Sequence, residues 1–239
     1  MYALTRRAIA ALVMISPSLA AAQVFEDSVE RPIRGAAGAS FSYGRPVGDF
    51  LRYVHEGYGL DGFLRFNIEP QGILSLKLDG GFLIYGSETK RVPLSSTVGA
   101  RILVDLTTSN NIAWMGFGPQ LTLPVGPFRP YGSASIGFSY FFTESSVEGS
   151  DDAFDFANTT NFEDFTFRYG FGWGVVIPFQ STGTEWGIDI GAQYHGNGQV
   201  RYLREGGITD LPNGSIILNP IQSDANLLTY RLGFSVSFR

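Results

Sequence analysis

Charged side chains stand among the small and polar residues that alternate with apolar ones in several segments of the chain. With one amide they form a set that could do chemistry if it faced a common interior: Asp61, Arg65, Lys77, Asp79, Arg168, Asp189, Gln193 and Arg231. The set holds three acids and four bases, and a buried charge without a partner is costly. We therefore expect acids and bases to pair. A salt-bridged interior and a channel lined by the same charges both fit these residue types.

The chain has two histidines and no cysteine, so thiol chemistry and disulfides are excluded. His55 lies beside Glu56, whereas His195 precedes Gly196 and Asn197 with no serine at a matching spacing. A general base needs a positioned partner, so the sequence favours a hydrogen-bonded role for His195 over a catalytic one. No His-x-x-x-His pattern and no basic patch is present, so we expect no cofactor and no nucleic-acid partner.

One segment, residues 144–164, is strongly acidic. It contains seven acids and no Lys or Arg: Glu144, Glu148, Asp151, Asp152, Asp155, Glu163 and Asp164. Ca²⁺ and Mg²⁺ prefer carboxylate oxygens, so Glu148, Asp151, Asp152 and Asp155 are a candidate cation site that would dock on lipopolysaccharide through bridging ions. The segment lacks the glycine and terminal glutamate of a calcium-binding loop, and an acidic surface loop that is simply solvated is the alternative.

Residues 165–179 indicate which kind of element positions these groups. Every second side chain is apolar: Phe165, Phe167, Tyr169, Phe171, Trp173, Val175, Ile177 and Phe179. The residues between them are mostly small or polar. Successive side chains of a strand point to opposite faces, so the pattern predicts a β-strand with one wholly apolar face. A face this long requires lipid or a very large core to cover it.

The N-terminus favours lipid. Residues 1–22 carry Arg6 and Arg7, then an apolar run too short to cross a bilayer as a helix, then small residues at the expected cleavage site. We interpret this segment as a secretory signal peptide and residues 23–35 as a periplasmic lead-in. Removal of the signal leaves 15 basic against 22 acidic residues. No later window is apolar enough for a transmembrane helix, so a closed barrel of strands is the remaining way to span lipid.

Seven further segments show the same alternation. With residues 165–179 they predict eight strands, at 37–44, 58–68, 74–86, 113–123, 133–142, 165–179, 186–195 and 228–238. Two details of the fourth strand fit less well, because Trp114 falls on the inner face and Pro119 removes a ladder hydrogen bond. A bulge is expected at Pro119.

The connections alternate in length. Short turns at 69–72, 125–128 and 180–185 follow the even strands, whereas long loops at 45–56, 87–111, 144–162 and 196–224 follow the odd ones. Outer-membrane barrels have this asymmetry, with short periplasmic turns and longer extracellular loops. Residues 101–106 are strand-like, so we expect the third and fourth strands to continue beyond the membrane as a hairpin.

The closing run carries apolar residues at alternate positions up to a terminal aromatic: Tyr230, Leu232, Phe234, Val236 and Phe238. It resembles the signal that the barrel-assembly machinery recognises, although Arg239 follows the final Phe. With the signal peptide and the eight strands, the chain resembles the small outer-membrane β-barrels that include OmpX, OmpW and the membrane domain of OmpA. The resemblance implies an all-β, eight-stranded antiparallel up-and-down transmembrane barrel at residues 36–239.

The resemblance also implies location and partners. We expect a monomer in the bacterial outer membrane, surrounded by lipid and lipopolysaccharide and inserted by the assembly machinery. The favoured function is a non-enzymatic envelope or surface-interaction role through the long loops. A narrow channel for small solutes or ions is the alternative. Since some small outer-membrane barrels are lipid-modifying enzymes that use His, an enzyme using His195 is a third hypothesis.

Overall fold

A computed structural model describes residues 33–93, 103–123, 127–149, 155–180, 184–211 and 215–238. The predicted signal peptide and nearly all of the predicted lead-in lie outside these residues. Gly35, at the end of the predicted lead-in, already belongs to the first strand.

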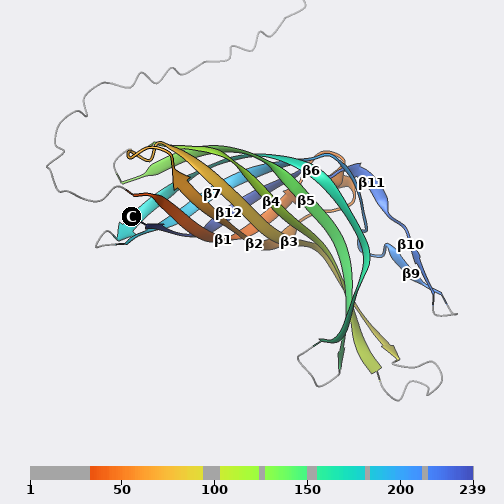
Figure 1. The fold of residues 1–239 in the computed structure, drawn as a ribbon. Helices are drawn as coiled ribbons and strands as arrows, with labels where there is room; N and C mark the ends of the chain where they lie inside the picture. The colour runs from red at the N-terminus through yellow and green to blue at the C-terminus, as the bar shows by residue number, and fades with distance from the viewer. Residues whose placement is uncertain are drawn as a thin grey trace, which may run out of the picture. The chain divides into compact units, whose positions relative to one another are not determined.

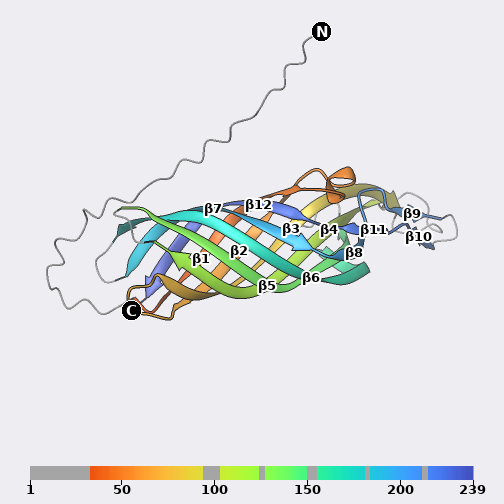
Figure 2. The same ribbon diagram turned by 90° about the horizontal axis from the view of Figure 1, so that it is seen from above.

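Eight strands close into one antiparallel barrel in the order β1-β12-β7-β6-β5-β4-β3-β2 (Figures 1 and 2). Their bounds are β1 Gly35–Pro46, β2 Gly57–Asn67, β3 Leu74–Pro93, β4 Leu103–Thr122, β5 Arg129–Gly149, β6 Asp155–Gln180, β7 Glu185–Asn197 and β12 Leu227–Phe238. Each strand pairs with its neighbours in the chain, and β1 pairs with β12 to close the ring. The predicted fold class is confirmed.

The two faces of the barrel differ as the alternation predicted. Outward residues such as Leu60, Phe138 and Phe165 expose 65%, 65% and 66% of their surface. Tyrosines of neighbouring strands lie together at one end of this apolar belt. The centroid of the Tyr43 ring is 5.3 Å from that of Tyr58 and 6.4 Å from that of Tyr230. Because a closed ladder pairs its backbone groups between strands, this belt can face hydrocarbon. The described residues contain no helix of the length and hydropathy that a membrane crossing requires.

The short connections lie at one end of the barrel, which we name the turn end. There the Gly72 N–H donates to the Glu69 carbonyl at 3.1 Å, and Gly72 has φ +70°, a conformation that glycine adopts without strain. The turn predicted at 69–72 is confirmed. The other two predicted turns lie partly outside the described residues. The opposite end, where the long connections gather, is the loop end.

Four strands continue past the loop end of the closed ring. The β2–β3 pairing stops at Tyr58 and Ile84, but β3 and β4 remain paired to Pro93 and Leu103. Likewise β5 and β6 remain paired to Glu148 and Asp155. Figure 1 shows these ribbons bending to one side beyond the barrel. The predicted hairpin extension of the third and fourth strands is confirmed, and most of the loops predicted at 87–111 and 144–162 are instead strand.

Register shifts accompany the bend of this four-stranded extension. One lies between Ile84 and Gly86 in the β3–β4 ladder, and others lie at Thr143/Glu144 and Val147/Glu148 in the β5–β6 ladder. A bulge adds an unpaired residue and bends its strand. The bulge predicted at Pro119 is wrong, because Pro119 pairs in register with Leu76. Pro119 and Gly118 are missing only from the β4–β5 ladder, so proline removes a hydrogen bond there without shifting the register.

The connection predicted as a long loop at 196–224 is also largely paired. It contains β8 (Gln199–Tyr202) paired with β11 (Ile221–Asp224), and β9 (Ile208–Asp210) paired with β10 (Ile216–Leu218). The loop at 45–56 contains the short 3₁₀ helix η1 (Phe50–Arg52). Neither feature was predicted, because segments of three or four residues are too short for an alternation to be recognised.

Candidate functional site

Arg168 lies at the centre of a polar network inside the barrel. Its side chain has no solvent exposure, and Nη2 donates to Asp79 Oδ2 at 3.0 Å. Gln193 Nε2 donates to the same carboxylate oxygen at 3.2 Å, so the Asp79 carboxylate accepts hydrogen bonds from both a guanidinium and an amide. These residues come from β3, β6 and β7, and their contacts therefore cross the lumen as well as following its wall. The network fills the barrel with fixed hydrogen bonds.

A second cluster lies nearer the turn end. Arg231 Nη1 lies 3.6 Å from Asp61 Oδ1, and Arg231 Nη2 donates to the Tyr131 hydroxyl at 2.8 Å. The Tyr131 hydroxyl in turn donates to Asp189 Oδ1 at 2.6 Å. Tyr131 was not among the predicted network residues, because its inward position follows only from the register of β5. It connects Arg231 with Asp189, which do not form an ion pair with each other.

The structure places all eight predicted network residues inside the barrel and buries each of them. Ion pairing, however, is incomplete. Arg168 pairs with Asp79 and Arg231 with Asp61, but no ion pair within 4 Å forms at Lys77 or Arg65 in the described part of the chain. The Lys77 ammonium instead lies 5.4 Å from the centre of the Phe63 ring, a cation–π contact.

His195 is a member of the lumen network. Arg168 Nε donates to His195 Nδ1 at 2.8 Å, so Nδ1 carries no proton. The proton of the neutral ring is therefore on Nε2, which lies 3.0 Å from Thr229 Oγ1 and donates to it. The ring is 2% exposed and packs edge-on against Trp114 at 4.9 Å between centroids. Both nitrogens are engaged, and neither reaches a surface where a substrate could bind.

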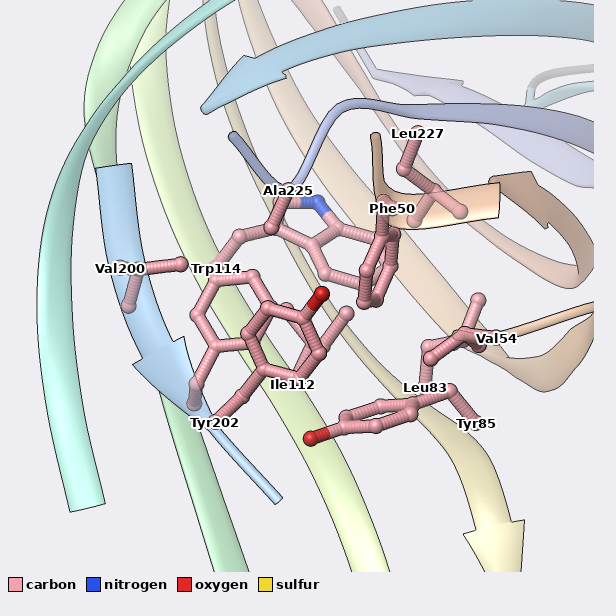
Figure 3. Close-up of a cluster of buried hydrophobic side chains, with 11 residues drawn as sticks. Phe50, Val54, Leu83, Tyr85, Ile112, Trp114, Val200, Tyr202, Ala225 and Leu227 are labelled. Atoms are coloured by element: carbon pink, nitrogen blue, oxygen red, sulfur yellow. The ribbon is translucent and has the colours of Figure 1, made fainter. Parts of the chain in front are cut away.

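An aromatic plug closes the lumen at the loop end. It consists of the buried side chains Phe50, Val54, Leu83, Tyr85, Ile112, Trp114, Phe141, Val200, Tyr202, Ala225 and Leu227. Phe50 projects from η1 and is fully buried, with ring centroids 5.1 Å from Tyr202 and 5.7 Å from Tyr85. Figure 3 shows these side chains converging from the barrel wall, from β8 and from the first loop. The plug therefore joins the loops to the strands.

The sequence contained a signal for this plug. Inner-face positions near the loop end of the strands hold large apolar residues, as at Leu83, Ile112 and Phe141. Only Trp114 was noticed, as a residue that did not fit the alternation. A local loss of alternation on several neighbouring strands would have indicated an apolar layer across the barrel.

The strand extension beyond the plug has two outer edges. On the β3 edge, Lys90, Arg91 and Pro93 supply the charges and the proline that discourage further strand pairing. The β6 edge at residues 157–163 has no Lys, Arg or Pro, and residues 157–160 are exposed. Within the described residues, this stretch of β6 pairs with β5 alone. It is an open edge.

Asp164 marks where this open edge meets β8, beyond the apolar belt. Its Oδ2 accepts the Arg201 N–H at 2.9 Å and Arg201 Nε at 3.2 Å. Burial tends to raise the pKa of Asp164, but these bonds and the Phe165 N–H outweigh it, so the pKa lies below its ordinary value. Asp164 thus fastens β8 to β6.

The predicted cation site remains a prediction. Asp151 and Asp152 lie outside the described residues, and only the backbone of Glu148 and Asp155 is described, where the two residues pair across the β5–β6 ladder. Among the side chains that are described, no group of three or more acids or histidines converges as metal ligands would.

Two cavities lie at the loop end of the barrel, and the second of them touches the plug at Val54 and Tyr85. One of about 190 Å³ lies between the extension and the segment from Arg204 to Asp210, and hydroxyl and amide groups including Thr108, Ser145 and Asn161 line it. The other, of about 370 Å³, is lined by Tyr53, His55, Glu56, Tyr85 and Arg204 among others. His55 therefore faces a surface cavity, separate from the lumen and from His195.

The closed ring of eight strands, its apolar belt and its polar interior together define a transmembrane β-barrel. Comparison of the sequence with known protein families gives the same class. The chain belongs to the "Outer membrane protein beta-barrel domain" family, whose sequence pattern matches residues 8–238. No curated protein matches the chain significantly.

Several solved structures share the fold. Neisserial surface protein A is 13% identical, with 87% of this chain and 100% of that one covered and a TM-score of 0.45. Ail, the attachment invasion locus protein of Yersinia pestis, is 12% identical, with 87% and 99% covered and a TM-score of 0.41. The outer membrane protein AlkL is 14% identical, with 91% and 96% covered and a TM-score of 0.37.

Proposed function

We propose that this protein is a non-enzymatic, non-conducting barrel of the bacterial outer membrane that binds a partner protein at the cell surface. In the orientation typical of such barrels, the turn end faces the periplasm and the loop end the exterior. The observation that carries the proposal is the combination of a sealed lumen with four strands that continue past the seal. The side chains that fill the lumen leave the extension as the accessible surface.

The open edge of β6 is the part of that surface best suited to recognition. An extended peptide can add to such an edge through main-chain hydrogen bonds. The segment from residue 144 to 164 has seven acids and no base, so it repels a second copy of itself and favours a basic strand. The proposed partner is therefore a protein with an extended, positively charged segment.

Peptide binding tests this function. The refolded barrel in nanodiscs is titrated into a fluorescent ten-residue peptide that alternates Lys with Val, and into the matching Glu peptide. We expect binding of the Lys peptide alone, and at least tenfold weaker binding after Asn158→Lys with Thr160→Lys, because edge lysines block strand addition. Thr209→Lys with Gln222→Lys adds the same charge to the small sheets and serves as the control. Equal loss in both double variants would refute edge recognition.

The sealed lumen opposes the channel alternative. The network around Arg168 and the plug around Phe50 stand in series along the barrel, so a solute would have to displace both. We expect no steady single-channel conductance from the folded protein in planar bilayers. Conductance that changes with Arg168→Gln would contradict the proposal and identify the lumen as a pathway.

The geometry of His195 opposes the enzyme alternative. Its two nitrogens are engaged by Arg168 and Thr229, and the ring lies below the plug. We expect His195→Gln to leave the mass spectrum of lipid A in expressing cells unchanged. A difference in lipid A acylation between the wild type and this variant would revive the catalytic role.

A further inference from the structure

The charged residues that the barrel strands point inward below the plug do not balance. The bases are Arg65, Lys77, Arg129, Arg168 and Arg231, and the acids are Asp61, Asp79, Glu185 and Asp189. Three ion pairs account for three bases: Arg168 with Asp79, Arg231 with Asp61, and Arg129 with Glu185 in a two-pronged contact. Asp189 is engaged by the Tyr131 hydroxyl. Arg65 and Lys77 are left without a carboxylate within 4 Å in the described part of the chain.

Arg65 is the base that faces an open space. It is 8% exposed, and among the described residues its side chain makes one hydrogen bond, a weak one from Nη1 to the Thr122 hydroxyl at 3.3 Å. Its Nε is buried and has no hydrogen-bond partner among the described residues. A buried guanidinium without an anion is unfavourable, because the desolvation of its charge is not offset.

A cavity of about 160 Å³ lies beside Arg65 at the turn end. Its lining also contains Arg129, the Thr122 hydroxyl, and Gln71 and Gly72 of the first turn, but no acid. A single water molecule needs a cavity volume of about 10–15 Å³, measured in the same way, so this cavity has room for a polyatomic ion. A second cavity of only about 10 Å³ is lined by Arg65, Lys77 and Arg129 and by the carboxylate residue Asp189.

We propose that this cavity binds a phosphate-type oxyanion, which enters from the periplasmic side. A guanidinium presents a fork of N–H donors that matches two oxygens of such a group, and the Arg65 side chain lines the cavity. Arg129 also lines the cavity, with its charge shared with Glu185, and Thr122 contributes a hydroxyl. A cation would be repelled by both arginines, and an apolar ligand would leave the guanidinium unpaired. The anion supplies the partner that the described residues do not.

Nitrogen-15 spectroscopy of the arginine side chains tests the site. The barrel is labelled at arginine, refolded in a maltoside detergent free of phosphate, and titrated with inorganic phosphate. The Arg65 Nε–Hε signal is assigned as the one that Arg65→Lys removes. We expect it to shift saturably at millimolar phosphate, while the signal of the exposed Arg45 does not saturate. An Arg65 signal that stays in place, or shifts only in proportion to ionic strength, overturns the proposal.

Two further measurements complete the test. Arg129→Gln leaves the Arg65 signal visible and should weaken phosphate binding at least tenfold, so the test stands even where Arg65→Lys does not refold. Unchanged affinity in that variant would overturn the two-arginine site. Phosphatidylglycerol nanodiscs identify the source: an Arg65 signal already at its bound position there indicates a lipid headgroup, whereas a shift only on phosphate addition indicates a soluble anion.

Discussion

Replacement of Asp79 by Asn should destabilise the barrel more than almost any other single change of comparable size. The substitution keeps the shape of the side chain but removes the carboxylate that Arg168 Nη2 contacts at 3.0 Å. Arg168 would retain His195 as its acceptor and remain fully buried with an unpaired charge. Breaking a buried pair in this way costs about 3–5 kcal/mol.

A double-mutant cycle separates this cost from the loss of a single contact. Arg168→Met alone leaves Asp79 with Gln193, whereas Asp79→Asn combined with Arg168→Met removes both charges. The double variant should be more stable than Asp79→Asn, and the coupling should exceed about 2 kcal/mol. Urea unfolding in lipid vesicles, followed by tryptophan fluorescence and by the heat-dependent gel shift, measures each free energy of unfolding.

An exposed pair in the extension provides the matched control. Arg91 Nε lies 3.6 Å from Asp105 Oδ1, with side chains 59% and 37% exposed. The same cycle there should yield coupling below about 1 kcal/mol, because water screens the charges. Additivity within about 0.5 kcal/mol at Asp79 and Arg168 would refute the reasoning, since it would mean that water already solvates the lumen charges.

Three further results are expected. Phe50→Ala removes a fully buried ring, which typically lowers the free energy of unfolding by about 3–5 kcal/mol, and it should expose the 45–56 loop to limited proteolysis while the barrel stays folded. An unchanged cleavage pattern would contradict the role of Phe50 in the plug. The folded pKa of Asp164 lies below its ordinary value, so its clamp on Arg201 stabilises β8 at neutral pH and is lost as the pH falls through the folded pKa. Hydrogen-exchange protection at β8, corrected for the intrinsic pH dependence of amide exchange, should therefore fall in acid, and Asp164→Asn should abolish that change, with about 0.5 kcal/mol at stake for so exposed a pair. Gly137→Ala should impair folding because its new Cβ would lie 1.9 Å from the Met115 carbonyl oxygen, whereas Gly132→Ala, with nothing within 4 Å, should fold normally as judged by the gel shift.

The membrane part of the fold could be predicted because lipid and a polar lumen impose opposite requirements on alternate residues. The outward set from Phe165 to Phe179 shows this directly, and so do the five apolar residues of β12, which the structure places on its outer face. Beyond the membrane this constraint ends. Residues 157–161 read Ala-Asn-Thr-Thr-Asn, which are compatible with strand or loop, and their pairing follows only from continuation of the β5–β6 ladder.

The site was harder to predict than the fold. Alternation assigned Asp61, Asp79 and Arg168 to the interior, but the choice of partners depends on the stagger between strands far apart in the chain. Arg168 and Asp79 are 89 positions apart, and Tyr131 and Asp189 are 58 apart. The numbers of acids and bases in a sequence therefore say little about which groups pair. The plug escaped prediction for a related reason, since it is assembled from six separate segments.

The two ends of the lumen differ in a way that limits where a ligand can come from. At the loop end, the plug packs aromatic rings to centroid distances of 5–6 Å. At the turn end, the lining of the 160 Å³ cavity reaches the first turn and carries Arg65 and Arg129. Anchoring the strand extension does not require an arginine without an acidic partner, such as Arg65, at the turn end of the lumen. Its lumen should therefore respond to solutes added on the periplasmic side and be indifferent to those added outside, and one-sided phosphate addition to oriented proteoliposomes separates the two cases.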